Sequence, residues 1–417
     1  MPGQFQSVQG FNDVLYPDVT KFNRIENTVR ELFSLYNFKE IRTPIIEKTG
    51  LFVRSIGGST DIVEKEMYTF KDKGEESLTL RPEGTASAVR AYLEHDIDKK
   101  DAVQKWFYIG PMFRHERPQK GRFRQFYQAG IEVFGIDDPV IDAEVIGLAK
   151  DVIDALSIKG VVIRLNSIGC PACRPDYIRE LKLFLYGVKD QLCDDCQRRI
   201  ETNPLRVLDC KKHGCIGTTK NAPKITEHLC ADCASHFDSV KHGLDLLKIQ
   251  YTIDTRLVRG LDYYTKTVFE FTVDTNNAQN AVIAGGRYDY LVELLGGGHV
   301  PAVGFAMGME RIADLLKLPD ERNPDVFIAV LVPRARSKAF ELMGMLRQNG
   351  IMCDTTYGEK TIKSMMRRAG KLKARVVMII GEDELEHGYV TLKRMADAHQ
   401  DKVKESEVLN HILKNSI

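Results

Sequence analysis

The sequence lacks the features that mark membrane and secreted proteins. Among its 417 residues, no apolar run approaches the roughly 20 residues that a membrane-spanning helix needs. Residues 1–10 contain no basic stretch followed by an apolar one, which is the pattern of a secretory signal. We therefore expect a cytoplasmic protein with no membrane partner. Charge of one sign is not in excess either, and the formal net charge of +1 excludes a uniformly basic nucleic-acid coat.

Two widespread nucleotide-binding motifs are also absent. Neither the phosphate-binding loop G-x-x-x-x-G-K-[ST] nor the dinucleotide fingerprint G-x-G-x-x-G occurs. Any nucleotide must therefore be bound by another framework, and arginine side chains are the candidates. With 43% hydrophobic and 28% charged residues, the composition is that of an ordinary globular protein. The length favours two or three domains over a single core.

Cysteine is almost absent outside one segment. Eight of the nine cysteines fall between positions 170 and 233. They form four close pairs, three of them C-x-x-C: Cys170/Cys173, Cys193/Cys196, Cys210/Cys215 and Cys230/Cys233. A C-x-x-C turn presents two thiolates to a tetrahedral metal, so we predict structural zinc, with free or redox-active thiols as the alternative.

The eight thiols suffice for two four-cysteine sites, although one site is also possible. Pairing in sequence order would join the first pair to the second and the third to the fourth. The spacing allows crossed pairing equally. His213 lies within the widest pair and could replace a thiolate, but a lone histidine between lysine and glycine is more often a solvated surface residue.

Periodic apolar residues predict a sheet flanked by helices in residues 1–320. Their helical spacing predicts a helix from Pro17 to Asn37. A strand is expected at 39–47, with Pro44 at an edge or irregular position, because proline has no backbone donor. Further strands are expected at 67–70, 78–80, 106–113, 125–134, 161–165, 252–258, 267–273 and 280–284. The segment 301–316 is expected to begin as a strand and to continue as a helix. Strands connected in this way suggest an antiparallel or mixed sheet.

Residues 167–250 interrupt this pattern and are expected to form an inserted domain. A bound metal would stabilise it, because its own core would be small. If the insert is separate from the sheet, removing the metal should loosen the insert alone and leave the sheet intact.

A polar stretch, 317–324, is expected to link these parts to a compact α/β domain at 325–417, in which strands and helices alternate. The fold class is therefore a multidomain α+β protein with an α/β C-terminal domain. This domain holds 16 lysines and arginines against 12 acidic residues, a net of +4. A helix expected at 360–372 has a basic face (Lys360, Lys363, Arg367, Lys371) and an apolar face (Ile362, Met366, Ala369, Leu372). The basic face contacts either RNA or solvent alone.

Three segments resemble the signature motifs of class II aminoacyl-tRNA synthetases. They are the strand with Pro44, the segment F-R-H-E at 113–116 with the charged loop 117–122 after it, and the segment 304–311, whose Gly304 and Gly308 would allow close backbone approach. Two further segments, R-G-L-D-Y-Y at 259–264 and A-G-G-R-Y-D at 284–289, are similar to the histidine-specific signatures of histidyl-tRNA synthetases. Segments 80–85 and 108–125 resemble the same family, and the resemblance covers the chain except the insert.

The resemblance implies an enzyme that activates histidine with ATP and transfers it to tRNA. For histidine it implies Glu83, Thr85 and Gln128 at the ammonium group, Glu132 and Tyr264 at the imidazole, Tyr263 and Tyr288 in the same pocket, and a catalytic pair, Arg114 and Arg259. Such a pocket would reject an apolar isostere, because an unmatched buried polar group costs ~1–3 kcal/mol. Glu132 could instead be a solvated carboxylate on the outside of its strand.

The resemblance also implies an ATP site, a dimer and a tRNA contact. For ATP it implies Arg114 at the α-phosphate, Arg122 and Arg311 at the terminal phosphates, Glu116 at the adenine amino group and Phe126 stacked on the ring. Magnesium would bridge the phosphates, held largely by water and substrate. The family pattern further implies a homodimer with Pro44 at its interface and a C-terminal anticodon-binding domain.

Two other functions are compatible with parts of this pattern. A regulatory paralogue of this family, which has lost aminoacylation and serves a histidine-biosynthetic transferase, would lack the C-terminal domain and have degraded histidine signatures. An ATP-dependent ligase on the same fold could use another acid. It would keep Arg114 and Arg311 but would need neither the Tyr263-Tyr264 pair nor the C-terminal domain.

Overall fold

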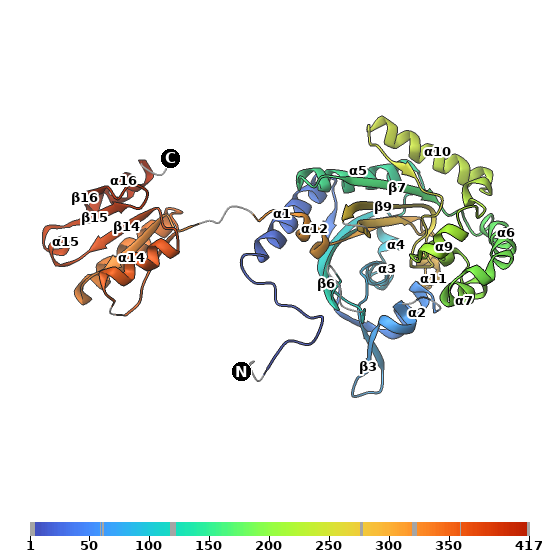
Figure 1. The fold of residues 1–417 in the computed structure, drawn as a ribbon, viewed down its shortest axis with the longest axis horizontal. Coiled ribbons are helices and arrows are strands. Elements are labelled where there is room, and N and C mark those ends of the chain that lie inside the picture. The colour runs from blue at the N-terminus through green and yellow to red at the C-terminus, as the bar shows by residue number, and fades with distance from the viewer. Residues whose placement is uncertain are drawn as a thin grey trace. The chain divides into compact units, whose positions relative to one another are not determined.

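The computed structural model describes residues 5–58, 60, 62–116, 122–275, 278–318, 323–358 and 360–414. Contacts divide the chain into two units, Met1–Leu318 and Pro319–Ile417, and each has a core of its own (Figure 1). Most of the charged loop predicted at 117–122 lies outside the described residues. Among the described helices, none is long and apolar enough to cross a bilayer.

The first unit is built on an eight-stranded sheet. Its six central strands are antiparallel, and two short strands pair in parallel at the edges. The strand order is β1 (Lys39–Glu40), β5 (Gln104–Phe113), β6 (Gln125–Phe134), β11 (Ala302–Gly308), β10 (Ala278–Arg287), β9 (Thr265–Thr275), β7 (Val161–Ser167) and β8 (Thr252–Ile253). A separate three-stranded sheet has the order β2 (Ile46–Lys48), β4 (Ser77–Leu80) and β3 (Tyr68–Lys71).

Two predicted strands differ from the observed ones. The segment 39–47 is not one strand, because Pro44 lies in an irregular stretch between β1 and β2, where no ladder hydrogen bond is required of it. The segment 252–258 contributes only the two residues of β8 to the sheet. After β8 the chain turns, with the amide of Leu257 donating to the carbonyl of Asp254 at 2.9 Å.

Helices cover both faces of the sheet. In α1 (Val19–Leu35), Ile25, Val29 and Phe33 recur at intervals of four residues and are fully buried. They share a core with the sheet, α5 (Val140–Ala155), α10 (Ala231–Leu246) and α12 (Met309–Leu315). The other face packs against α3 (Thr85–Glu94) and α11 (Leu291–Leu294), with α2 (Thr49–Ile56) and α4 (Ile97–Lys100) beside α3 (Figure 1).

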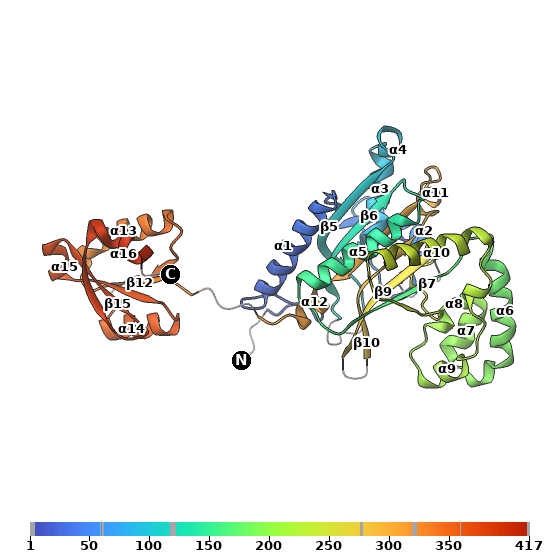
Figure 2. The same ribbon diagram turned by 90° about the horizontal axis from the view of Figure 1, so that it is seen from above.

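The insert between β7 and β8 is helical. It consists of α6 (Arg174–Gly187), α7 (Asp194–Thr202), α8 (Leu205–Leu208), α9 (His213–Thr218) and α10 (Figure 2). It belongs to the first unit and is not a unit of its own. Tyr177, Leu181 and Leu185 of α6 pack in the same buried cluster as Tyr264 and Tyr288 of the sheet's site face. The buried residues of the insert therefore continue into those of the sheet.

The second unit is a mixed sheet with helices on both faces. Its strand order is β13 (Cys353–Thr355), β12 (Val326–Val330), β14 (Val376–Ile380), β15 (Tyr389–Arg394) and β16 (Gln400–Lys404). Its helices are α13 (Arg336–Gln348), α14 (Ile362–Lys371), α15 (Glu382–His387) and α16 (Val408–Lys414). The predicted α/β alternation is confirmed as far as β14, whereas the antiparallel strands β15 and β16 were not anticipated. In α14, Met365 and Ala369 are buried and Ile362 is 42% exposed, so the predicted apolar face was partly misplaced.

Candidate active site

Strand β6 brings three of the predicted site residues to one face of the sheet. Side chains alternate between the two faces along a strand, and the odd-numbered residues 129, 131 and 133 pack into the core beneath α1 and α5. Phe126, Gln128 and Glu132 therefore point to the opposite face. Glu132 is only 1% exposed, which excludes a solvated carboxylate on the outside of the strand.

Glu132 is held by three hydroxyl groups. Thr85 Oγ1 donates to it at 2.7 Å, Tyr108 OH donates at 3.1 Å, and Tyr288 OH donates to its second oxygen. Gly304 is its register partner on β11, and a Cβ there would collide with the carboxylate, so this glycine allows the predicted close approach. Burial raises the pKa of Glu132 to about 8, against the opposing effect of the hydroxyl donors. A ligand with a positive charge or a ring N–H would therefore favour the ionised form of Glu132.

Three tyrosines line the pocket beside Glu132. The ring centroids of Tyr263 and Tyr264 are 4.7 Å apart, and those of Tyr263 and Tyr288 are 5.6 Å apart. All three side chains are buried. The guanidinium of Arg259 lies 5.7 Å from the ring centroid of Tyr264 and forms an ion pair with Glu270 of β9. The pocket therefore joins an aromatic wall to a fixed cation.

The start of α3 forms another wall of the pocket. The carboxylate of Glu83 accepts the backbone N–H groups of Thr85 at 2.6 Å and of Ala86 at 2.9 Å. Glu83 thus fixes the first turn of α3, a role that the sequence analysis missed. Gln128 Oε1 is buried and has no hydrogen-bond partner in the part of the chain that the structure describes. An unpartnered buried acceptor favours a ligand that donates hydrogen bonds.

Arg114 lies directly after β5, among Pro82, Phe126 and Glu116. Its Nε donates to the carbonyl of Pro82 at 2.8 Å, and its guanidinium lies 5.3 Å from the ring centroid of Phe126. Glu116 lies 3.9 Å from Arg114 and 3.1 Å from Arg122. The side chain of Arg122 is 52% exposed, so it stands at the mouth of the site while Arg114 lies deeper.

Arg311 joins this cationic end from α12. Its Nη1 donates to the carbonyl of Ala281 at 2.6 Å. Burial lowers the pKa of Arg311, and the like charges of Arg122 and Arg114 lower it further, which places three guanidinium groups in one neighbourhood. Gly308 ends β11 just before α12, and a Cβ there would meet Arg311 only at 3.7 Å, so close approach does not require this second glycine.

Comparisons with known proteins show the family of this chain. A family model for histidyl-tRNA synthetase matches residues 10–171 and 210–312, and an anticodon-binding-domain model matches residues 325–415. The chain belongs to the histidyl-tRNA synthetase family. A curated protein named histidine–tRNA ligase, from Trichlorobacter lovleyi, is 52% identical over 397 residues, which are 95% of each chain.

Solved structures of this family have the same fold. Apo histidyl-tRNA synthetase from S. aureus is 37% identical, with a TM-score of 0.82 over 98% of this chain and 100% of that one. A structure from Bacillus halodurans described as an ATP phosphoribosyltransferase regulatory subunit/histidyl-tRNA synthetase is 18% identical, with a TM-score of 0.65 over 88% of this chain and 97% of that one. This second likeness shows the fold alone.

Two residues of the synthetase site were missed in the sequence. Tyr108 of β5 packs its ring where a Cβ on Gly84 or Gly130 would lie, and it donates to Glu132. Gly130 is the register partner of Tyr108, and this pairing is seen only in the folded sheet. Glu270 forms the ion pair that orients Arg259. Nothing in the sequence pairs these two residues, because strand β9 is needed to bring Glu270 beside the loop.

The clustered cysteines form two sets of four, and the family model leaves residues 172–209, which hold three of them, unmatched. The proximal set, next to β7, is Cys170, Cys173, Cys230 and Cys233, and the distal set is Cys193, Cys196, Cys210 and Cys215. The pairing in sequence order was wrong, because α10 returns to β7 and brings the last pair back to the first. His213 belongs to neither set.

Proposed function

We propose that the chain is a histidine–tRNA ligase, which forms histidyl-adenylate and pyrophosphate from histidine and ATP and then transfers histidine to tRNA. The observation that carries the proposal is the buried Glu132, which accepts hydrogen bonds from three hydroxyl groups and lies near Tyr264, whose ring adjoins the guanidinium of Arg259. Curated relatives named histidine–tRNA ligase, at 52% and 51% identity over 95% of this chain, support it.

In this proposal histidine lies between Glu132 and the start of α3. Glu132 and Tyr264 bind the imidazole, because a buried carboxylate and a phenol together can satisfy both ring nitrogens. Gln128 Oε1, which lacks a partner within the described residues, accepts from the α-ammonium group. Thr85 and Glu83 complete that end, and Tyr263 and Tyr288 exclude water from the pocket.

Adenylate formation requires two anions to approach each other. A carboxylate oxygen of histidine bonds to the α-phosphorus of ATP, and the bond from that phosphorus to the bridging oxygen of pyrophosphate breaks. Fixed cations lower this barrier because they need no reorganisation as charge develops. We assign Arg259 and Arg114 to the carboxylate and α-phosphate, and Arg311 and Arg122 to the terminal phosphates. Magnesium enters as part of the ATP complex.

Adenine binding is assigned to the residues around Arg114. Phe126 offers a ring face, and Glu116 offers an acceptor for the adenine amino group. At present the guanidinium of Arg114 lies over Phe126, and Glu116 is paired with Arg122. Binding of ATP would therefore exchange these internal contacts for contacts to the base and the phosphates.

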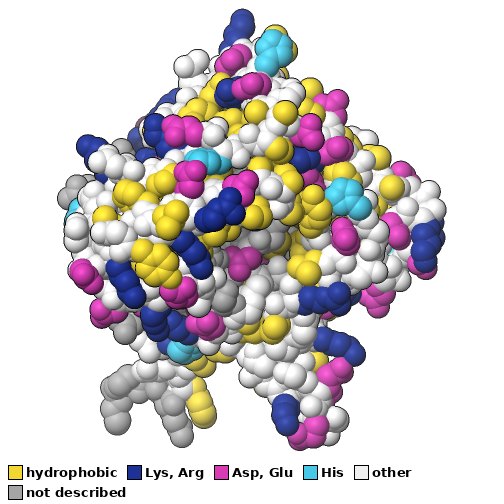
Figure 3. Space-filling model, turned by 90° about the vertical axis from the view of Figure 1, so that its right-hand side faces the viewer, with side chains coloured by type: hydrophobic (Ala, Val, Ile, Leu, Met, Phe, Trp, Pro, Cys, Tyr) yellow, Lys and Arg dark blue, Asp and Glu magenta, His cyan; other side chains and the backbone are white. Residues whose placement is uncertain are grey.

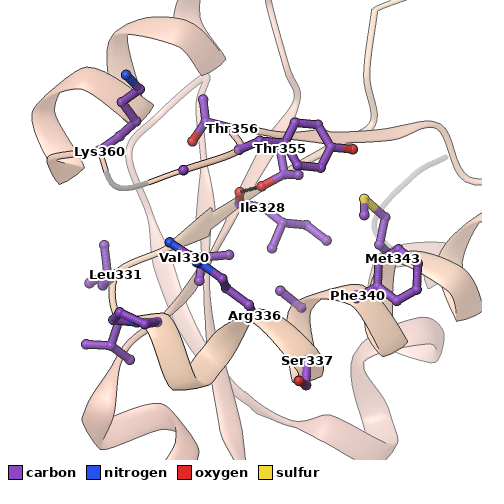
Figure 4. Close-up of a pocket in the computed structure, with 15 residues that line it drawn as sticks. Ile328, Val330, Leu331, Arg336, Ser337, Phe340, Met343, Thr355, Thr356 and Lys360 are labelled. Carbon is purple, nitrogen blue, oxygen red and sulfur yellow. Dashed lines mark hydrogen bonds between the residues drawn. The ribbon is translucent and has the colours of Figure 1, made fainter.

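The second unit is assigned to the tRNA. Figure 3 shows the right-hand side of Figure 1, where the first unit is drawn; basic and acidic side chains are interspersed on that face, so charge alone marks no RNA path there. A cavity of ≈ 630 Å³ in the second unit offers a better contact (Figure 4). Helix α13 supplies Arg336 and Phe340, which is 71% exposed, and the segment after β13 supplies Thr356 and Lys360.

The chemistry of this cavity suits an unstacked nucleobase. Aromatic faces such as Phe340 and Tyr357 stack on bases, and Arg336 and Lys360 attract phosphates. Thr356 Oγ1 is buried and has no hydrogen-bond partner among the described residues, so a base edge could satisfy it. The exposed lysines and arginines of α14 extend the basic surface next to Lys360.

A homodimer is the proposed assembly. Ile45 and Ile46 follow Pro44 and are 42% and 45% exposed, which leaves apolar surface at β2, an edge strand of the three-stranded sheet. A second copy would cover this surface with its own, as two-fold symmetry requires. Light scattering should give twice the mass of the 47.2 kDa chain.

Zinc fits both cysteine sets. Four sulfurs bonded to zinc at about 2.3 Å lie about 3.8 Å apart in a tetrahedron. In the proximal set, Cys170 Sγ lies 3.8 Å from Cys173 Sγ and 3.9 Å from Cys230 Sγ, and Cys173 Sγ lies 3.9 Å from Cys233 Sγ. In each set all four sulfurs lie within 4.8 Å of one another. Thiolate ligands imply a reducing compartment, so we place the enzyme in the cytoplasm.

The proposed function is tested by pyrophosphate exchange into ATP, measured separately with each of the twenty amino acids. We expect exchange with histidine and with no other amino acid. Exchange with a different amino acid would support the ATP-dependent ligase. Absence of exchange in a folded protein that still binds histidine would support the regulatory paralogue instead.

A further inference from the structure

The histidine pocket and the cysteine-bearing insert are physically continuous. Helix α6 of the insert and the pocket tyrosines belong to one buried cluster. The two cysteine pairs of the proximal set are 60 residues apart in sequence. Each pair begins a helix, α6 after Cys173 and α10 after Cys230. A metal bound by the four thiolates would therefore fix the relative position of these two helix starts.

The first helix start contacts Tyr264. Arg174 is the first residue of α6, directly after Cys173. Its Nη2 donates to the carbonyl of Tyr264 at 2.7 Å and to that of Gly169 at 3.1 Å, and its Nε donates to the carbonyl of Ile168 at 3.1 Å. The guanidinium thus joins the cysteine turn to the backbone of a pocket tyrosine.

Backbone pairing strengthens this connection. The amide of Ile168 donates to the carbonyl of Lys266 at 2.8 Å, and the amide of Lys266 donates to the carbonyl of Gly169 at 2.9 Å. Gly169 has a φ of +65° and lies so close to the cluster that a Cβ would meet Cys173 Sγ at 2.8 Å. The turn that carries the first two thiolates is therefore hydrogen-bonded to the strand that follows Tyr264.

The second helix start leads to Tyr288. His236 lies one turn after Cys233 on α10, and its Nε2 is 2.9 Å from the carboxylate of Asp142 and 3.3 Å from Thr267 Oγ1. Asp142 also accepts from Arg287, at 2.6 Å, and both side chains are fully buried. Arg287 directly precedes Tyr288, which donates to Glu132. A buried pair of this kind tolerates little displacement, because an uncompensated buried charge is strongly destabilising.

The distal set has different connections. Arg256 donates to the carbonyls of Thr219 and Leu208, and Thr219 Oγ1 donates to the carbonyl of Cys215. These contacts reach the segment before Arg259 and involve no pocket tyrosine. The distal set is therefore a matched comparison, because it has the same four-cysteine composition but lies at α7 and α9 and has a different neighbour.

We propose that the metal-bound proximal set positions Tyr264 and Tyr288 through Arg174 and α10, and so sets the affinity of the pocket for histidine. Arg174 is a positioning residue that need not touch the substrate. The proposal rests on the proposed function, and it reverses the expectation that loss of metal would leave the catalytic sheet undisturbed.

The first test replaces Arg174. In purified full-length enzyme, Arg174→Ala should weaken equilibrium binding of histidine, measured by calorimetry, by about tenfold, as for the loss of one buried hydrogen-bond group. The KM for histidine should rise in parallel, whereas the KM for ATP and the zinc content should not change. Arg174→Lys keeps a donor and should recover part of the affinity. Arg179→Ala, on the same helix and 69% exposed, is the control and should match the wild type.

The second test compares the two sets without changing Arg174. Cys230→Ser/Cys233→Ser and Cys193→Ser/Cys196→Ser should each lose one zinc, but only the first should weaken histidine binding. Unchanged histidine affinity in both Arg174→Ala and the proximal double variant would overturn the proposal. Equal weakening in the two double variants would overturn it as well, because it would indicate general loosening of the insert. A wild-type enzyme without histidine-dependent exchange would instead contradict the proposed function.

Discussion

At the scale of the residue, the stability of the fold and the proposed function favour different protonation states of Glu132. A carboxyl group with no solvent contact is more stable protonated, and burial raises its pKa to about 8. Histidine binding, by contrast, needs the anion, because an imidazole N–H donates to a carboxylate more strongly than to a neutral acid. The hydroxyls of Thr85, Tyr108 and Tyr288 hold the group in place in either state. In the proposed function, Glu132 is thus a group retained for binding at a cost to the fold.

We therefore expect Glu132→Gln to stabilise the enzyme and to impair it. The folded pKa lies above the ordinary value of 4.5, so this group contributes stability below that value and loses it as pH rises through about 8. The Tm of the variant should exceed that of the wild type increasingly from pH 5 to pH 8. Histidine-dependent exchange should fall about 10–100-fold, as for loss of a charge-assisted hydrogen bond.

The control for this variant is Glu31→Gln, on the exposed side of α1. Its Tm and exchange rate should follow those of the wild type at every pH. If the Tm of Glu132→Gln lies below that of the wild type by the same amount at every pH, the carboxyl group is ionised and hydrogen-bonded in the folded state. That result would contradict the argument from burial.

Arg259 presents the opposite case, a cation that the fold already pairs. Arg259→Ala should lower the rate of adenylate formation by about 100–1,000-fold or more, because a preorganised donor at developing charge contributes about 3–4 kcal/mol. Single-turnover formation of adenylate is the measurement, with Arg54→Ala, exposed on α2, as the control. The variant should fold, though less stably, because Glu270 loses its partner. Near-normal adenylate formation with a loss of tRNA charging alone would contradict the role.

At the scale of the element, the spacing of apolar residues predicted those helices and strands that depend on neighbouring residues in the sequence. The spacing of Ile25, Val29 and Phe33 fixes both the helix α1 and its buried face. Most strands, including β6 with its alternating faces, also follow from the sequence. The interruption at Pro44 could be located as an irregularity but not as a break between two sheets, because the partner strands decide where pairing ends.

The pairing of the cysteines could not be predicted from their spacing in the sequence. Spacing identified all eight thiols as candidate metal ligands, but either pairing satisfied the spacing. The choice depends on α10, which packs on α5 and returns the last pair to β7. Likewise, the ion pair of Arg259 with Glu270 and the hydroxyls around Glu132 come from segments far apart in sequence. The family resemblance named Arg259, Glu132, Thr85 and Tyr288 but not Tyr108 or Glu270, and all of these contacts required the folded sheet.

The two sets predict a metal content. Enzyme purified under reducing conditions, without added metal or chelator, should contain about two zinc ions per chain by elemental analysis, because each closed structural site takes four thiolates. Cys193→Ser/Cys196→Ser should lower the content by one ion and make residues 193–215 more sensitive to protease. Wild-type enzyme with less than about half an equivalent of zinc would contradict the assignment of metal to either set.

At the scale of the whole molecule, the proposed function assigns activation to the first unit and tRNA contact to the second. All residues assigned to histidine and ATP lie in the first unit, which has its own buried core. The second unit has a separate core around β12 and β14 and carries the cavity with Phe340 and Thr356. A core confined to each unit allows one to fold without the other. Activation and tRNA selection should therefore be separable by truncation.

Removal of residues 325–417 should leave histidine-dependent pyrophosphate exchange measurable and sharply weaken tRNA charging. The exchange survives because the truncation removes none of the assigned arginines or tyrosines, and charging fails because the RNA contact is lost. The full-length enzyme should also charge tRNA less well as salt rises, since phosphate contacts release counterions, whereas its exchange should be less sensitive.

A single substitution tests the same division without truncation. Phe340→Ala in the full chain should raise the KM for tRNA about 5–100-fold, because stacking of one base contributes about 1–3 kcal/mol. Leu413→Ala, on α16 and 44% exposed, is the control in the same unit and should charge tRNA normally. Pyrophosphate exchange should be equal in both variants and the wild type. If the truncated enzyme charges tRNA with unchanged efficiency, the second unit makes no productive RNA contact, and the cavity at Phe340 must serve another ligand.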